Sequence, residues 1–223
     1  MKRTISAMRG PGSLNHNRRS FTAENVDPKR SSLNVVYRDE PIQKVYHELF
    51  DEAVKRYNAK QKRKDRCITD YYEHLRTGKQ EKLFHELIVQ IGNKDDMGVL
   101  TENGALAKEL LDEYMQGFQE RNPTLRVFGA FLHMDEATPH LHIDFVPYVS
   151  GWKGKGLDTK VSLKQALKAL GFAGGSNGIR AEPVDQRRER AACRRDGAAW
   201  HRVGTERHPR RAPVCAGLQK AGA

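Results

Sequence analysis

The chain has 223 residues, of which 38% are hydrophobic and 30% charged, and a net charge of +11 that favours a polyanionic partner, nucleic acid first. No apolar run approaches the roughly 18 residues that a membrane-spanning helix needs, and the basic N-terminus lacks the apolar stretch of a secretion signal. The three cysteines are scattered without a CxxC pair, which argues against structural disulfides and a thiolate zinc site and favours a cytoplasmic location.

The N-terminal region combines one predicted strand with two polar loops. Residues 4–9 form the predicted strand, and Gly10-Pro-Gly-Ser13 ends it. A polar loop with the sequence Asn15-His-Asn-Arg-Arg19 follows, and a second turn-rich segment over residues 25–34 leads to a short apolar run at residues 35–37. Neither loop can bury itself, so the histidine, arginine and asparagine side chains are available for chemistry.

The central region predicts two amphipathic helices and a strand. Pro41 opens the first helix, since proline suits the first helical turn. Its apolar residues recur at helical spacing and define one buried face. They are Ile42, Val45, Tyr46, Leu49, Phe50, Ala53 and Tyr57. Residues 60–66 are the basic, exposed end of this helix, and residues 68–76 predict a second helix more weakly. Residues 83–91 predict a strand, because most of their apolar residues lie at alternate positions. The second long helix begins near Thr101, a plausible N-cap, and ends at Asn122-Pro123.

A histidine-rich stretch, His133-Met-Asp-Glu-Ala-Thr-Pro-His-Leu-His142, separates two apolar runs at residues 125–132 and 143–149. The runs predict neighbouring antiparallel strands joined by a turn. Because side chains alternate along a strand, His140 and His142 share a face, and His133 lies beside them if the strands pair. A single strand histidine is usually structural, but three within ten residues beside two carboxylates predict a metal site.

The two acidic residues of the connecting turn belong to the same predicted site. Asp135 and Glu136 follow His133 directly, so they can orient ligands or act as a base. A three-histidine set leaves open positions and suits a divalent ion that acts as a Lewis acid. By ligand type, zinc and manganese are both acceptable.

The C-terminal third contains a basic turn, a helix and a change of composition. Gly151-Trp-Lys-Gly-Lys-Gly156 is either a nucleic-acid backbone contact or a merely solvated hairpin. Residues 162–170 form a short helix. After Gly175 the sequence is rich in arginine and alanine and has no regular period, so we predict an irregular, disordered tail over residues 174–223. One interpretation is a nucleic-acid-binding tail, and another is out-of-frame translation of a GC-rich gene.

These motifs resemble those of one family. The stretch HMDEATPHLH resembles the HxDExxPHxH motif of the plasmid mobilisation and recombination relaxases, the Mob/Pre family of the HUH endonuclease superfamily. His16-Asn-Arg-Arg19 resembles the N-terminal HxxR element of that family, and residues 25–34 resemble the segment after it. The resemblance covers about residues 1–173, which we take as the relaxase domain. The match of the histidine stretch is highly specific, whereas that of His16-Asn-Arg-Arg19 alone is weak.

The resemblance implies site- and strand-specific DNA nicking and rejoining at a plasmid origin of transfer, for plasmid mobilisation, conjugation and recombination. The substrate would be single-stranded or supercoiled DNA. His133, His140 and His142 would hold a divalent metal ion, with Mn²⁺ or Mg²⁺ favoured and Zn²⁺ as a third candidate. Longer family members have C-terminal helices that support a homodimer, and this chain has the arginine-rich tail instead.

The resemblance also implies roles for residues near the histidine stretch. His16 would be the nucleophile, Glu136 would accept its proton or orient its ring, and Arg19 would stabilise charge, with Asp135 beside them. From the residues alone, a loop histidine next to two arginines has a lowered pKa, which keeps it neutral and nucleophilic. Many relaxases use tyrosine instead, and Tyr37 is the nearest N-terminal candidate.

The expected DNA contacts are basic and amide side chains in the loops. They are Arg18, Arg30, Asn34, Lys153 and Lys155. Rival hypotheses are a rolling-circle replication initiator of the same superfamily, an inactive DNA-binding remnant, and a hydrolase of small substrates. The expected fold is α+β, similar to that of HUH relaxases: a mainly antiparallel central sheet carries the histidine strands centrally, and the two long helices pack on one face.

Overall fold

The computed structural model describes residues 5–78 and 80–172, so the predicted tail lies outside the described residues. In chain order the elements are β1 (Ile5–Arg9), α1 (Leu14–Asn17), η1 (Pro28–Leu33), β2 (Val35–Asp39), α2 (Ile42–Asn58), η2 (Lys64–Arg66), α3 (Tyr71–Thr77), β3 (His85–Ile91), α4 (Gly104–Gln116), α5 (Phe118–Arg121), β4 (Leu125–His133), β5 (His140–Val149), β6 (Lys160–Val161) and α6 (Leu163–Ala169). Across these ranges no helix is long and apolar enough to span a bilayer.

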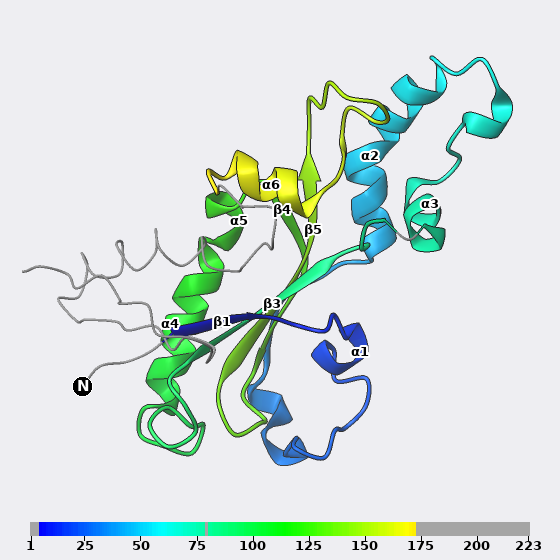
Figure 1. Cartoon of the computed structure of the whole chain (residues 1–223). Coiled ribbons are helices and arrows are strands. Elements are labelled where there is room, and N and C mark those ends of the chain that lie inside the picture. Colours follow the sequence, from blue (N-terminus) through cyan, green and yellow to red (C-terminus); the bar gives the residue numbers. More distant parts are fainter. Residues whose placement is uncertain (1–4, 79, 173–223) are drawn as a thin grey trace, which may run out of the picture.

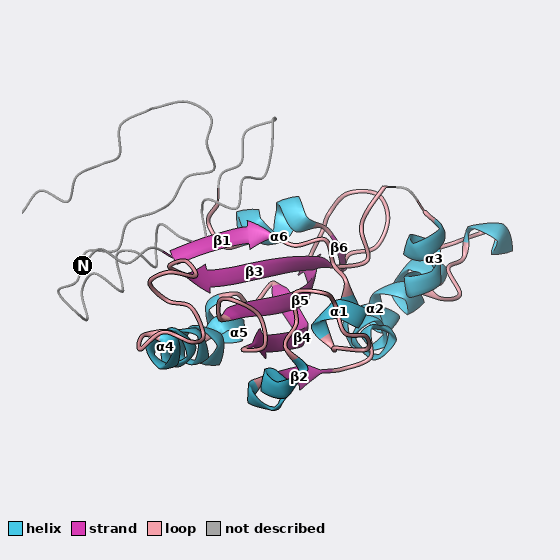
Figure 2. Cartoon of the chain, turned by 90° about the horizontal axis from the view of Figure 1, so that it is seen from below, coloured by secondary structure: helices cyan, strands magenta, loops and turns pink. Residues whose placement is uncertain are grey.

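The sheet is antiparallel and has the histidine strands at its centre. Five strands run in the order β1-β3-β5-β4-β2, and β6 pairs with the far end of β5 (Figure 2). Strand β5 is therefore flanked by β4, its sequence neighbour, and by β3, which precedes it by about fifty residues. The predicted α+β class with a mainly antiparallel sheet is confirmed.

The two faces of the sheet differ in chemistry because side chains alternate along each strand. On β5, Leu141, Ile143 and Phe145 join the larger apolar core, together with residues of α4, α5 and α6. The opposite face carries His140, His142 and Asp144, and becomes apolar only at Val146. The strand thus has one wholly apolar face and one that is polar along half its length.

Helix α2 packs on the second face, beyond the histidines. Its buried residues contact Val146 of β5 and Phe128 of β4, and Figure 1 shows α2 and α4 on opposite sides of the sheet. The expectation that both long helices share one face therefore needs correction in this detail. A β-bulge between Val127 and Gly129 is the physical reason that Phe128 can reach α2, because it breaks the alternation of β4.

The structure differs from the prediction at two helices. Helix α4 begins at Gly104 with Asn103 as its cap, whereas the hydroxyl of Thr101 donates to the Gly98 carbonyl at 2.8 Å and closes the preceding turn. His16 lies in the single-turn helix α1, where the sequence predicted a loop. Four residues are too few to show a helical period.

Candidate metal centre and nucleophile

The end of the β4–β5 hairpin brings three histidines together. His133, the last residue of β4, pairs directly with His140, the first of β5, and His142 lies two residues further on the same face. Their ring centroids are 4.6 to 5.2 Å apart. All three are buried, with exposed fractions of 1%, 8% and 4%. The predicted convergence of these imidazoles on one face is therefore present in the structure.

Each imidazole has one nitrogen committed to a hydrogen bond with an oxygen. Nδ1 of His140 donates to the Thr138 carbonyl at 2.8 Å, and Nδ1 of His142 donates to Oε1 of Glu86 at 2.7 Å. Nε2 of His133 donates to the carbonyl of Asn17 at 3.0 Å. Because these oxygens only accept, they fix the tautomers and leave the other nitrogen of each ring unprotonated.

The uncommitted nitrogens fit a metal ion. Nδ1 of His133 and Nε2 of His142 are buried without a hydrogen-bond partner. Such atoms are costly in a folded protein unless a ligand satisfies them. Burial lowers the pKa of His133 to about 3, and burial followed by the charge of His142 lowers the pKa of His140. Neutral imidazoles with free lone pairs are the form that binds a divalent ion.

Helix α1 places a fourth histidine against this triad. The ring of His16 lies 5.6 Å from those of both His133 and His142, and one ligand nitrogen of each of the four histidines lies within 4.8 Å of the others. Burial and the neighbouring Arg19 guanidinium lower the pKa of His16, although Glu136 opposes the shift. His16 is therefore mainly neutral near pH 7 and close enough to act on a group held at the triad.

Arg19 links His16 to the acidic turn. Its Nη1 lies 3.2 Å from Nε2 of His16, and its Nη2 donates to Asp135 at 2.6 Å and to Glu136 at 2.8 Å. Oε1 of Glu136 is 3.5 Å from Nε2 of His16 and 3.7 Å from Nε2 of His140. Nε2 of His16 thus faces a cation and a carboxylate, and its tautomer decides whether it accepts from Arg19 or donates to Glu136.

The two carboxylates of the turn have different surroundings. Asp135 is fully buried, and its oxygens accept from Arg19, Ser31 at 3.0 Å and Asn34 at 2.6 Å. Burial alone would raise the pKa of Asp135, but these hydrogen bonds outweigh it and hold the pKa well below its usual range. Asp135 is suited to anchoring Arg19. Glu136 is the carboxylate nearer to His16.

Several predicted DNA contacts brace this turn within the protein. Oδ1 of Asn34 accepts from the Met134 amide at 2.7 Å, so both polar atoms of its side chain are engaged. Arg30 donates to the Glu136 carbonyl at 3.2 Å and pairs with Asp27 at 3.0 Å. The segment around η1 therefore holds the histidine hairpin from the side.

The remaining predicted contacts are exposed side chains outside the acidic turn. Arg18 forms an exposed pair with Asp39 at 2.6 Å. Lys153 and Lys155 are exposed in the loop between β5 and β6. Trp152 in the same loop is partly covered, and the Lys160 ammonium lies 4.1 Å from the centre of its ring.

Tyr37 does not reach the histidine face. Its side chain packs against the apolar core on the opposite face of the sheet, and its hydroxyl donates to Asp112 of α4. Burial and this carboxylate raise the pKa of Tyr37 well above its usual range. This partly buried phenol therefore lies on the opposite face of the sheet from His16 and the three histidines.

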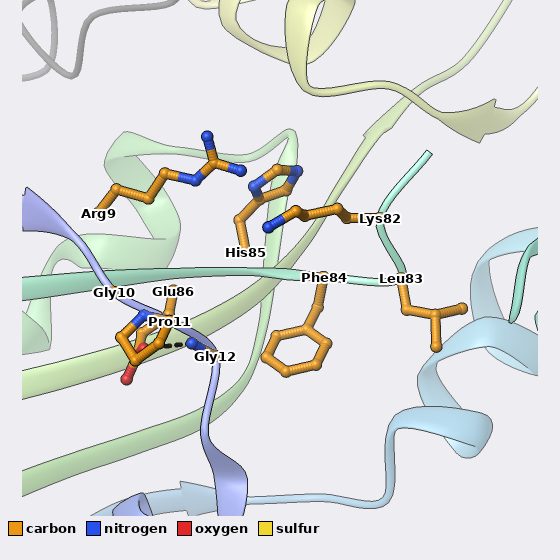
Figure 3. A pocket seen from close by; sticks show the side chains of 9 residues that line it. All are labelled: Arg9, Gly10, Pro11, Gly12, Lys82, Leu83, Phe84, His85 and Glu86. Atoms are coloured by element: carbon orange, nitrogen blue, oxygen red, sulfur yellow. Dashed lines mark hydrogen bonds between the residues drawn. The ribbon is translucent and has the colours of Figure 1, made fainter. Parts of the chain in front are cut away.

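Sequence reasoning missed three buried polar residues beneath the site: Asn17, Glu86 and Asp144. Glu86 lies on the histidine face of β3, and Figure 3 shows it turned away from His85 and bonded to the Gly12 amide, at 2.7 Å. Burial would raise the pKa of Glu86, but hydrogen bonds from His142, Gly12 and Asn17 lower it instead. Burial raises the pKa of Asp144 to about 7. For Glu86 and Asp144, the available signal was a single carboxylate within a mainly apolar strand.

Comparison with known proteins places this geometry in context. Residues 36–170 match the family described as plasmid recombination enzyme, Mob_Pre. No curated protein matches the chain.

Among solved structures, the chain is similar to the MobM relaxase domain. One structure of that domain, with manganese and a 22-nucleotide plasmid pMV158 origin-of-transfer DNA bound, is 22% identical to this chain and has a TM-score of 0.44. The match covers 84% of this chain and 99% of the MobM chain. Another structure of the domain, with a 23-nucleotide origin-of-transfer DNA and manganese, is 21% identical and has a TM-score of 0.41. The match covers 85% of this chain and 98% of the MobM chain.

Proposed function

The chain belongs to the Mob/Pre family of plasmid recombination enzymes, and from this premise we propose that it nicks one DNA strand at a plasmid origin of transfer and rejoins it. The observation that carries the proposal is the approach of His16, from α1, to three histidines more than a hundred residues later in the chain. We assign this activity to residues 1–173 and no catalytic role to residues 174–223.

The metal cradle in this proposal consists of His133, His140 and His142, one ligand nitrogen of each lying within 4.8 Å of those of the others. When bound there, a divalent ion supplies positive charge that polarises the scissile phosphate. Mn²⁺ and Mg²⁺ are the first ions to test, and Zn²⁺ is the third. The Glu86 carboxylate and the Thr138 carbonyl hold His142 and His140 in the tautomer that leaves Nε2 free.

The proposed reaction is a transesterification with His16 as the nucleophile. A ring nitrogen of His16 attacks phosphorus, the P–O3′ bond breaks, and a 5′-phosphoramidate forms on the protein. Glu136, 3.5 Å from Nε2 of His16, takes the proton that the ring loses, and the leaving 3′-oxygen takes a proton from water and ends as a 3′-hydroxyl. Arg19 stabilises negative charge on the phosphate, and Asp135 holds Arg19 in place. Rejoining is the reverse reaction and needs no nucleotide cofactor.

The DNA lies on the histidine face in this proposal. Arg18, Lys153 and Lys155 contact its phosphates, and Arg30 and Asn34 act mainly through the turn that they brace. The fourth histidine could alternatively be a metal ligand, since all four ligand atoms lie close together. The Arg19 guanidinium, 3.2 Å from Nε2 of His16, argues against a second cation on that nitrogen.

Cleavage of a labelled single-stranded origin oligonucleotide across a series of divalent metals tests the proposal. The wild-type chain should release a labelled fragment and carry the other on a single residue, which mass spectrometry should map to His16. His16→Ala should abolish the adduct, and His140→Ala should weaken metal-dependent cleavage at least about tenfold. His47→Ala is the matched control, because His47 is an exposed histidine on α2. An adduct on Tyr37 that survives His16→Ala would sink the assignment.

A further inference from the structure

Asn17, the residue after His16, is a buried amide with no role in the chemistry described above. It is the last residue of α1, and only 2% of its surface is exposed. Burying an amide is unfavourable unless hydrogen bonds replace those lost to water. The partners of Asn17 therefore indicate what its burial achieves.

Those partners lie on three adjacent strands. Nδ2 of Asn17 donates to Oε1 of Glu86 on β3 at 2.8 Å and to Oδ2 of Asp144 on β5 at 2.9 Å. Its main-chain carbonyl accepts from Nε2 of His133 on β4 at 3.0 Å. One residue next to His16 thus ties α1 to each strand beneath the site.

The same contacts reach two of the three proposed metal ligands. The carbonyl of Asn17 fixes the tautomer of His133 directly. The amide of Asn17 shares Oε1 of Glu86 with Nδ1 of His142, which donates to that oxygen at 2.7 Å. Asn17 is therefore placed to set the ring orientation of both histidines together with the position of His16.

Helix α1 needs such a tether. A helix of four residues has too few internal hydrogen bonds to be stable by itself. It follows a turn in which Gly12 has a φ of +82°, and it is followed by Arg19 with a φ of +53°, so the flanking chain is irregular. Arg19 holds the helix from the acidic turn, and Asn17 holds it from the sheet.

We propose that Asn17 is a positioning residue that holds the His16 imidazole against the histidine triad. The expected loss of cleavage rate rests on the proposed function, whereas the position of His16 does not. A displacement of about 1 Å at a nucleophile costs on the order of 10²-fold in rate. Asn17→Ala should lower kcat for oligonucleotide cleavage by about that factor at saturating Mn²⁺, with KM for the DNA nearly unchanged. Asn15→Ala, an exposed asparagine in the same helix, is the matched control.

Paramagnetic broadening of the His16 ring signals by Mn²⁺, with Mg²⁺ as the diamagnetic reference, measures the positioning without any cleavage. Broadening falls with the sixth power of distance, so Asn17→Ala should reduce it for His16 while His140 remains broadened. Circular dichroism checks the fold, and Asn17→Asp, which keeps the shape but removes the donors when ionised, serves if the alanine variant unfolds.

The outcomes separate the two hypotheses. Unchanged kcat and unchanged broadening of His16 in both variants would overturn the positioning role and leave the nicking proposal standing. A wild-type chain that does not nick, but whose His16 broadening depends on Asn17, would overturn the proposed function alone. A chain in which Mn²⁺ broadens no histidine would overturn the proposed metal cradle, and the His16 ring signals of the metal-free chain, unchanged in Asn17→Ala, would then overturn the positioning role as well.

Discussion

At the residue scale, the chemistry of the site depends on which nitrogen of each histidine is free. Three oxygens, one each from Thr138, Glu86 and Asn17, decide this. None of the three is a metal ligand in the proposed site. Removing one should therefore change metal binding without removing a ligand.

Glu86→Gln tests that dependence. The glutamine amide keeps the size of the side chain but loses the carboxylate charge that holds Nδ1–H of His142. The Mn²⁺ dissociation constant should rise about 10- to 100-fold, as for other residues that support a metal ligand. Isothermal titration calorimetry of the wild-type and variant chains gives the comparison. An unchanged dissociation constant would show that the orientation of His142 does not depend on Glu86.

The lowered pKa of His85, which lies on the other face of β3, predicts that the stability of the fold depends on pH. Burial, then the charges of Arg9 and Lys82, lower its pKa to about 4 from the usual 6.5. The pocket that these residues line is shown in Figure 3. Between pH 6.5 and 4 the unfolded chain therefore binds more protons at this position than the folded chain does. Stability from this group is complete above about pH 6.5 and is lost as the pH falls towards 4.

His85→Gln should remove this part of the pH dependence. Since His85 is only partly buried, the difference should be roughly 1–2 kcal/mol in the free energy of unfolding. Urea unfolding at pH 7.5 and pH 4.5, both without metal, measures it for the two chains. Equal losses of stability on acidification in wild type and variant would contradict the prediction.

At the element scale, the connection from β1 to α1 passes very close to the site. A Cβ at Gly10 would lie 2.0 Å from Oε2 of Glu86, and the Gly12 amide of the same connection donates to that oxygen at 2.7 Å. Glycine is needed at this position for close approach, not for an unusual backbone angle. The path of the connection and the support of His142 are therefore coupled.

Gly10→Ala should act on the metal site from a distance. The added methyl group must displace the Glu86 carboxylate, so the variant should weaken Mn²⁺ binding about as much as Glu86→Gln does. Gly151→Ala, at a glycine whose Cβ would meet nothing within 4 Å, is a control for the added methyl group, and its φ of +71° makes it the more strained backbone position for alanine. Calorimetry of both variants with Mn²⁺ checks the difference. Normal metal affinity in Gly10→Ala would mean that the connection can move aside.

At the scale of the whole molecule, the charge is divided between the domain and its tail. Residues 174–223 contain ten arginines and one lysine against five acids, which leaves a smaller positive excess in the rest of the chain. All residues of the proposed site precede this segment. We therefore expect the tail to add electrostatic attraction to DNA and no group to the proposed reaction.

A chain that ends at residue 172 should retain cleavage of the origin oligonucleotide with kcat within about twofold of the full chain. Its affinity for unrelated DNA should depend less steeply on salt, because fewer counterions are released. Binding measured between about 50 and 200 mM salt compares the two slopes. Loss of cleavage in the shorter chain would assign the tail a catalytic or folding role. Whether another reading frame after codon 175 encodes amphipathic helices tests the out-of-frame hypothesis separately.

The amino-acid sequence by itself determined the features that arise from local periodicity. The two-residue repeat put His140 and His142 on one face of a strand, and the 3.6-residue repeat predicted α2 and most of α4. The proline-containing turn between the histidines predicted their hairpin. The motif itself indicated the Mob/Pre family, which the family match over residues 36–170 confirms.

Only the tertiary structure decided which distant groups complete the site. The pairing of β3 with β5 brings Glu86 beside His142, and the packing of α1 on those strands buries Asn17 between Glu86 and Asp144. Neither contact leaves a periodic signal, because one carboxylate in a strand and one asparagine in a single helical turn satisfy no repeat. The strand register and the bulge that sends Phe128 to α2 are set by the summed packing of the whole sheet.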